Sequence, residues 1–288
     1  MVGTIASLHR YPVKSMAGER LEVCPVTDAG LIGDRGYALI DAETGKIVSA
    51  KRPQLWPDLL EFRATFVSEP TPGEPLPPAT ITFPDGASVR TDDPDVEDRL
   101  SSHFNRKVTL STSAAPGAVI EEFWLEDKGP NVYGEQRPDD GGIVTDFPAS
   151  GVAPAGTHFD FSALHVLTTS TLDALRCAYP SGKIDERRFR PNVVIATEAD
   201  GFVENDWEGV LEADGVGMAL MIPTPRCVMT TLAQGDLDRD PAVLRTMAEY
   251  NMIRAGGLGE LPCAGIYASV ASGGTLRVGA EVTLSAKQ

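Results

Sequence analysis

Short apolar runs that stop at proline or glycine occur along most of this sequence, and they constrain its fold more than any other feature. One run lies within residues 2–13 and stops at Pro12. Another lies within residues 216–227 and stops at Pro223 and Pro225. Residues 37–51 and residues 79–91 each hold two such runs around a turn, and the second turn is a Pro-Asp-Gly sequence. Runs of this length around turn residues predict strands and hairpins. The chain is therefore predicted to be mainly β.

Three segments carry helical patterns. Residues 93–104 have Asp93 as a candidate N-cap, a proline at the first helical position and apolar side chains that share a face. Residues 240–251 repeat this arrangement with Asp240 as the cap, and residues 164–180 indicate a strand that runs into a helix. The predicted fold class is α+β, mainly β with a few helices.

Two further segments bear on the organisation of the chain. Residues 128–156 are rich in glycine, proline and aspartate and predict a long loop, either a surface excursion or a lid, at a boundary between two halves. Residues 263–284 predict a closing hairpin joined by glycines. We therefore expect two β-barrel-like halves, at residues 1–120 and 121–288.

Charge and cysteine content narrow the functional class. The formal net charge of −16 at pH 7 argues against general binding of nucleic acid or anionic membranes, so any bound anion must be held by a few local cations. No apolar run approaches the roughly 20 residues that span a bilayer, and the N-terminus lacks a secretory signal pattern. The four cysteines form no CxxC pair, which excludes the usual disulfide and zinc spacings. We expect a cytoplasmic protein with reduced thiols and no membrane association.

One cysteine lies in an unusual setting. Cys227 follows two prolines and Arg226, and it precedes Thr230 and Thr231. Free cysteines are most often small core residues, but a thiol beside a cation and hydroxyl donors can instead be held as a thiolate. A thiolate acts either as a nucleophile, which needs a base such as histidine, or as a ligand to a soft metal. The residues alone leave these alternatives open.

Basic and polar residues at proline and glycine corners form the second candidate group. Lys14 and Ser15 follow a proline turn, Arg35 lies between two glycines, and Arg190 and Asn192 flank a proline before a strand. Lysine supplies a point charge and arginine a two-pronged donor, a combination suited to a phosphate. Taken singly, each basic residue is more often a surface ion-pair partner.

Six segments, taken in order, resemble the MOSC family, which is named for the C-terminal domain of molybdenum cofactor sulfurase. They are RYPVKSMAGERL, GLIGDRGYALID, LTTSTLDAL, FRPNVVI, PRCVMTTL and GGTLRVGAEVTL. The order is similar to that of the mitochondrial amidoxime-reducing components and their bacterial relatives. The resemblance implies an MOSC N-terminal β-barrel domain at residues 1–120 followed by an MOSC domain at residues 121–288.

The resemblance also implies roles for individual residues. Cys227 corresponds to the ligand of molybdenum in a molybdenum–pterin cofactor. The implied contacts to that cofactor are Lys14, Ser15, Arg35, Thr168, Thr171, Arg190 and Asn192. One departure is Thr169, because amidoxime-reducing members often carry an acidic residue there.

The implied activity is reduction of N-hydroxylated compounds by a molybdenum-dependent oxidoreductase. Electrons would come from a separate donor protein, such as a reductase, a flavodoxin or ferredoxin, or a b-type cytochrome, and the chain is expected to be a monomer. The alternative is a carrier of the cofactor or of sulfur that uses a persulfide on Cys227. A third possibility is a β-barrel binding protein without catalysis.

Overall fold

The structure is a computed structural model, and it describes residues 1–125, 136–139, 141–149 and 151–286. The strands of the first part of the chain are β1 (Gly3–Arg10), β2 (Glu19–Leu21), β3 (Val23–Thr27), β4 (Gly30–Leu31), β5 (Ala38–Asp41), β6 (Arg63–Phe66), β7 (Ala79–Thr82), β8 (Ser88–Arg90) and β9 (Val108–Ser111). A hairpin region follows with β10 (Val119–Leu125), β11 (Gln136–Asp139) and β12 (Gly142–Pro148). The remaining strands are β13 (Leu164–Thr168), β14 (Val193–Ala196), β15 (Val210–Ala213), β16 (Val216–Pro225), β17 (Met252–Arg254), β18 (Glu260–Ser272), β19 (Gly274–Arg277) and β20 (Glu281–Ser285).

The described helices are few and short. The α-helices are α1 (Val96–Phe104), α2 (Thr169–Ala178) and α3 (Ala242–Tyr250). The 3-10 helices are η1 (Glu186–Arg188), η2 (Val203–Asp206), η3 (Val228–Thr231) and η4 (Gly256–Leu258). Helix α1 begins at Val96, so its N-cap is Asp95 and not the predicted Asp93, and its predicted apolar face of Val96, Leu100 and Phe104 is buried. None of the described helices is long and apolar enough to cross a membrane.

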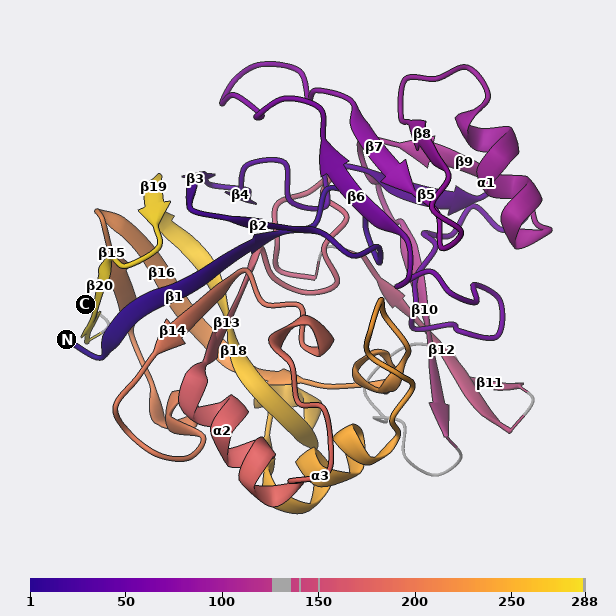
Figure 1. Cartoon of the computed structure of the whole chain (residues 1–288). Helices are drawn as coiled ribbons and strands as arrows, with labels where there is room; N and C mark the ends of the chain where they lie inside the picture. The colour runs from indigo at the N-terminus through magenta and orange to yellow at the C-terminus, as the bar shows by residue number, and fades with distance from the viewer. Residues whose placement is uncertain (126–135, 140, 150, 287–288) are drawn as a thin grey trace.

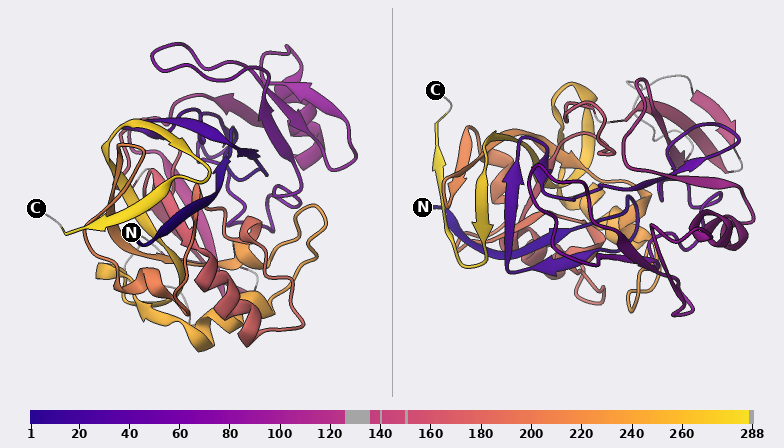
Figure 2. Two further views of the ribbon diagram at one scale, coloured as in Figure 1. Left: turned by 60° about the vertical axis from the view of Figure 1, so that its left-hand side comes forward. Right: turned by 90° about the horizontal axis from the view of Figure 1, so that it is seen from above.

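Seven strands close into a barrel in the order β13-β14-β1-β20-β15-β16-β18, because β18 also pairs with β13. Its interior is filled by side chains such as Leu8, Val166, Ile195, Met218 and Ile266. Helices α2 and α3 pack against its outside through a separate apolar cluster (Figure 1). Strand β1 therefore belongs to the same barrel as β20, the last strand of the chain, and the two strands lie at the same end of the molecule (Figure 2).

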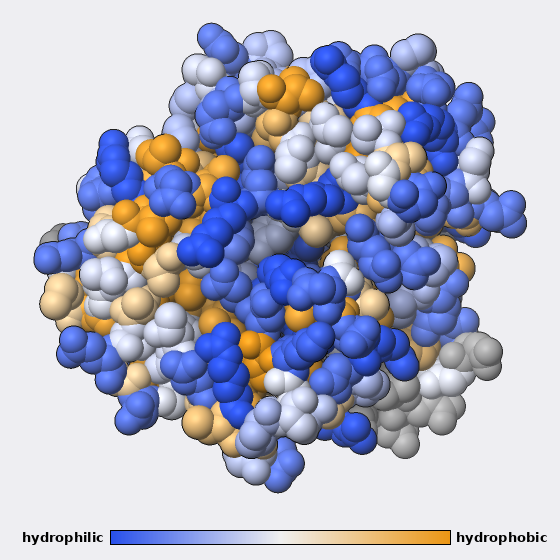
Figure 3. Space-filling model, in the orientation of Figure 1, coloured by the Kyte–Doolittle hydropathy of each residue, from blue (hydrophilic) through white to orange (hydrophobic). Residues whose placement is uncertain are grey.

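The other part of the molecule consists of small sheets. Strands β6, β7 and β8 form one sheet, and β5 pairs with β9. They pack with α1 around an aromatic group that includes Trp56, Phe62 and Phe104. On the face drawn in Figure 3 the surface is mostly hydrophilic, with hydrophobic groups scattered among charged ones. The predicted fold class, mainly β with a few helices, is confirmed.

Two local predictions are wrong. The expected loop over residues 128–156 contains strands β11 and β12, and β12 pairs along its length with β10; residues 128–135, 140 and 150 of that prediction lie outside the described residues. The expected closing hairpin does not form, because β18 pairs with β16 and β20 pairs with β15 and β1. Closing the barrel requires the last strands to pair with distant ones, and local turn signals carry no information about such partners. The domain boundary near residue 120 stays a prediction.

Candidate functional site

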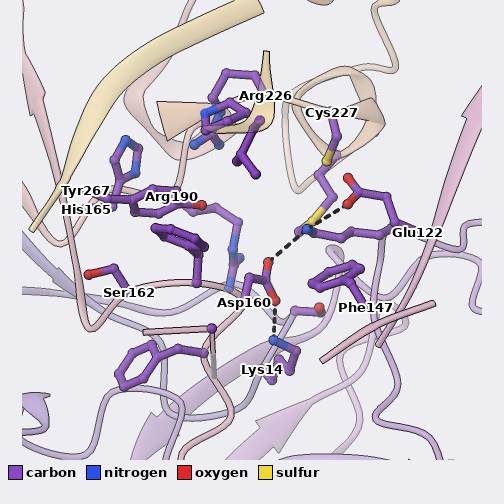
Figure 4. Close-up of a pocket in the computed structure, with 18 of the residues that line it drawn as sticks. Lys14, Glu122, Phe147, Asp160, Ser162, His165, Arg190, Arg226, Cys227 and Tyr267 are labelled. Carbon is purple, nitrogen blue, oxygen red and sulfur yellow. Dashed lines mark hydrogen bonds and ion pairs between the residues drawn. The ribbon is translucent and has the colours of Figure 1, made fainter. Parts of the chain in front are cut away.

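A cavity of about 500 Å³ lies where the small sheets, the β10–β12 hairpin and the barrel meet. Its volume is within the range of small-molecule sites. Six of the eight residues predicted from the sequence line it, namely Lys14, Ser15, Arg35, Arg190, Asn192 and Cys227. Figure 4 shows Lys14, Arg190 and Cys227 around this space, with Tyr267 and His165 on one side and Glu122 and Phe147 on the other.

Three of these residues have backbone angles that non-glycine residues rarely adopt. The φ angles of Ser15, Arg35 and Arg190 are 64°, 49° and 54°, in the left-handed region. A hydrogen bond of 2.7 Å from the Arg35 amide to the Tyr11 carbonyl holds one of these turns. Unfavourable backbone angles persist only where surrounding contacts impose them, and they concentrate at functional sites. Each turn presents its side chain to the cavity.

Two arginine side chains lie over a single aromatic ring. The guanidinium carbons of Arg35 and Arg190 are 4.6 and 4.2 Å from the centroid of the Tyr11 ring. Arg35 also donates a hydrogen bond to the buried carboxylate of Asp34. Arg190 has no carboxylate partner among the described residues, and its Nη2 is buried without a hydrogen bond. Burial lowers the pKa of Arg190 to about 10, and a guanidinium left in this state is stabilised by an anionic ligand.

Asn192 and Ser15 hold their neighbours in place. The Asn192 amide donates to Asp34 Oδ2 at 2.8 Å, and its Oδ1 accepts from the His165 backbone amide at 3.1 Å. Ser15 Oγ accepts a hydrogen bond of 3.1 Å from the Ala50 amide. Their polar groups are therefore used within the protein, and both residues position the groups that line the cavity.

A row of alternating charges crosses the cavity, and the sequence did not reveal most of it. Lys14 Nζ donates to the His158 carbonyl at 2.6 Å and pairs with Asp160. Lys51 Nζ lies 3.4 Å from Asp160 Oδ2 and 3.2 Å from Glu122 Oε2. Burial alone would raise the pKa of Asp160, but Lys14 and Lys51 outweigh it and hold that pKa well below its usual range. Burial opposes the charge of Lys51 as well, yet Asp160 and Glu122 raise its pKa. Neither Lys51, Asp160 nor Glu122 lies in a recognisable motif, so no sequence signal marks them.

Cys227 lies two residues after the end of β16. The Arg226 amide donates to the Pro262 carbonyl at 2.8 Å, which fixes the chain just before the cysteine. The hydroxyls of Thr230 and Thr231 donate to the carbonyls of Cys227 and Val228, and therefore do not reach the thiol. Burial raises the pKa of the Cys227 thiol to about 12, and Glu122 adds to this effect. Without a bound cation this thiol stays protonated.

Metal ligands of the usual kind are not clustered in the described part of the chain, where no group of three His, Cys, Asp or Glu residues could hold an ion. A metal at Cys227 would thus depend on further ligands from a cofactor.

Thr168 and Thr171 are not among the residues that line the cavity. Thr168 caps α2 by accepting from the Thr171 amide, and both hydroxyls donate to the buried carboxylate of Glu204 at 2.7 Å. Their assignment as cofactor contacts stays a prediction that this geometry does not support.

Comparison with known proteins identifies the family. Residues 2–103 match the MOSC N-terminal beta barrel domain, and residues 155–283 match the MOSC domain. The chain belongs to the MOSC family. Relatives include mitochondrial amidoxime reducing component 2 of Rattus norvegicus, 24% identical over 98% of this chain and 83% of the relative. Mitochondrial amidoxime-reducing component 1 of Homo sapiens is 25% identical over the same shares. Among solved structures, the YuaD protein of Bacillus subtilis is 9% identical with a TM-score of 0.45 over 98% of this chain and 94% of that one.

Proposed function

We propose that this protein is a molybdenum-cofactor-dependent oxidoreductase that reduces N-hydroxylated compounds, with Cys227 as the protein ligand of the metal. The observation that carries the proposal is the convergence of one thiol and five cationic side chains on one cavity of a strongly acidic protein. The names of the relatives support the reaction class. The family supports an association with the molybdenum cofactor.

The cavity residues fit an anionic cofactor. Arg190 Nη2 and Arg226 Nε are buried nitrogens without hydrogen-bond partners among the described residues. An unpaired buried donor destabilises the protein unless a ligand supplies an acceptor, and a phosphate does so with several oxygens. The single thiol suits a soft metal whose other ligands arrive with the cofactor. In a purely structural site, the unpaired cation and the lone thiol of this cavity would have no ligand to bind.

Different residues of the cavity would bind different parts of the cofactor. When bound, the cofactor would supply two-electron redox chemistry at molybdenum. Cys227 would hold the metal at the rigid end of β16, while Arg35 and Arg190 would hold the phosphate from the face of Tyr11. Conversion of N–OH to N–H consumes two electrons and two protons and releases water. The chain would receive these electrons from a separate donor protein.

A carrier that transfers sulfur through a persulfide on Cys227 is supported less well. Persulfide chemistry needs a nucleophilic thiolate, whereas burial raises the pKa of this thiol to about 12. The cavity residue His165 bonds the Ala264 carbonyl through Nε2 at 3.2 Å, so it is not arranged as a base for the thiol. These observations favour the ligand role.

The test is elemental and pterin analysis of protein made in cells that synthesise the cofactor, together with reduction of benzamidoxime by a chemical reductant. We expect molybdenum in a one-to-one ratio with the chain and measurable turnover. Cys227→Ser should remove turnover, because a hydroxyl is a harder and less acidic donor than a thiol. The matched control is Cys177→Ser, since Cys177 is exposed on α2. Full turnover and normal metal content in Cys227→Ser would refute the ligand assignment.

A further inference from the structure

Apart from Arg35, which pairs with Asp34, the charged residues of the cavity fall into two groups that differ in how well they are paired. Lys14, Asp160, Lys51 and Glu122 form a neutral row in which each cation contacts a carboxylate. Arg190 and Arg226 contact no carboxylate among the described residues, and Arg226 Nη2 donates to the Phe189 carbonyl at 2.7 Å. The unpaired arginines therefore form the part of the cavity that attracts an anion. The neutral row has no excess positive charge and does not attract an anion in the same way.

Glu122 is the incompletely bonded member of the neutral row. Its Oε2 accepts from Lys51 Nζ at 3.2 Å, and its Oε1 accepts no hydrogen bond from the described residues. The side chain is only 7% exposed. By contrast, the Asp160 carboxylate is shared between Lys14 and Lys51. A carboxylate oxygen that has no donor and belongs to a mostly buried side chain is a strong acceptor for an N–H group of a ligand.

The position of Glu122 places this oxygen at the reacting end of the cavity. Figure 4 shows its carboxyl group directed toward Cys227, and both residues line the same cavity. The amide of Phe123 donates to the Lys51 carbonyl at 3.0 Å, which ties the strand carrying Glu122 to the loop carrying Lys51. The carboxylate is therefore fixed in relation to the cavity.

The walls beside Glu122 are flat and apolar. The Phe147 ring lies 4.4 Å from Lys51 Nζ, and Trp124 also lines the cavity. Trp124 Nε1 is buried and has no hydrogen-bond partner among the described residues. A flat ligand group with N–H donors on one edge suits aromatic walls and a free carboxylate oxygen.

We propose that Glu122 is a specificity-determining residue whose free Oε1 accepts an N–H of an amidine-type group, so that the cavity selects N-hydroxylated substrates bearing such an edge over N-oxides that lack it. This inference rests on the proposed function in so far as it treats the bound compound as a substrate. The binding of the amidine group itself depends only on residues described above.

Benzamidine, which resembles the product of benzamidoxime reduction, is the probe. Its binding to the cofactor-loaded protein is measured by titration calorimetry for the natural sequence, Glu122→Gln and Glu122→Asp. The control is Glu121→Gln, because Glu121 points away from the cavity and pairs with Lys46 and Arg137. We expect Glu122→Gln to weaken benzamidine binding by about tenfold or more, as for loss of a charge-assisted hydrogen bond. Glu122→Asp should recover part of the affinity, and Glu121→Gln should match the natural sequence.

Kinetics supply the second readout. In Glu122→Gln the KM for benzamidoxime should rise by about the same factor, while the KM for an aromatic N-oxide should not change. Unchanged benzamidine affinity in Glu122→Gln, or no binding by the natural sequence, would overturn the inference even if amidoxime reduction proceeds. Benzamidine binding that depends on Glu122 in a protein without reductase activity would uphold the subsite and reject the proposed function. If Glu122→Gln changes the cofactor content, the benzamidine affinities of Glu122→Asp and Glu121→Gln are compared instead. A weaker affinity in Glu122→Asp upholds the inference, and equal affinities overturn it.

Discussion

Arg190 and Arg188 lie two residues apart and are both buried, yet they are bonded in opposite ways. Arg188 donates through its guanidinium to four backbone carbonyls, those of Lys183, Thr230, Leu232 and Asp238. Among the described residues, Arg190 contacts the face of Tyr11 and keeps a buried nitrogen without a partner. The first arginine is part of the folded framework. The second is arranged for a ligand.

This contrast yields a prediction for the two residues. Arg190→Met should lower pterin content strongly and leave the unfolding free energy of the cofactor-free protein unchanged or higher, because it removes an unpaired buried cation. Arg188→Met should lower that free energy by about 3 kcal/mol, because it leaves several buried carbonyls without donors. Pterin fluorescence after release and urea unfolding measure the two effects. Normal pterin content in Arg190→Met, even when combined with Arg35→Ala, would reject Arg190 as a cofactor contact.

The threonines before and within α2 should affect stability and not cofactor content. Thr171→Val removes a 2.7 Å hydrogen bond to the buried Glu204, which also accepts from the Gly265 amide at 3.1 Å. We expect a loss of about 1–3 kcal/mol in unfolding free energy. Thr171→Ser, which keeps the hydroxyl, is the control. If Thr171→Val instead loses pterin at unchanged stability, Thr171 contacts the cofactor after all.

Features that depend on residues close together in the sequence could be predicted, and features that depend on distant residues could not. The fold class and the apolar strands followed from apolar runs bounded by turn residues, and Cys227 follows β16 as the prolines indicate. The residues Lys14, Arg35 and Arg190 were found because each lies in a short motif at a turn. Lys51, Asp160 and Glu122 were missed, since they meet only when three distant segments fold together. Glu204 explains Thr168 and Thr171, and no sequence pattern couples residues so far apart.

Strand pairing in the barrel was unpredictable for the same reason. Strand β1 pairs with β14 and β20, which both lie far from it in the sequence. Turn residues report which neighbours can form a hairpin, but they do not report which distant edges meet when a barrel closes.

His165 should make the protein less stable in mild acid. Burial lowers the pKa of His165 from its ordinary 6.5 to about 3. Below pH 6.5 the unfolded chain therefore binds a proton that the folded chain does not, and the unfolding free energy falls by about 1.4 kcal/mol per pH unit. This loss continues until the pH reaches the folded pKa.

Urea unfolding at a series of pH values near neutrality and in mild acid measures this slope. His165→Gln should flatten it by about 1 kcal/mol per pH unit or more. His158, whose pKa is also lowered by burial, acts in the same direction and is present in both proteins. Equal slopes for the two proteins would show that His165 is not held neutral by the fold.

The protein should not accept electrons directly from NADH or NADPH. Hydride transfer needs a nicotinamide or flavin site, usually marked by a glycine-rich turn between a strand and a helix. The glycine-rich run at residues 255–259 instead includes η4 and joins β17 to β18, which pair with each other. Benzamidoxime should therefore be reduced with a chemical reductant or an added donor protein, and not with NADPH alone. With an added donor that has a basic face, the rate should fall as salt screens the acidic surface. Rapid turnover with NADPH and this chain alone would contradict the prediction, and a rate independent of salt would reject electrostatic docking of the donor.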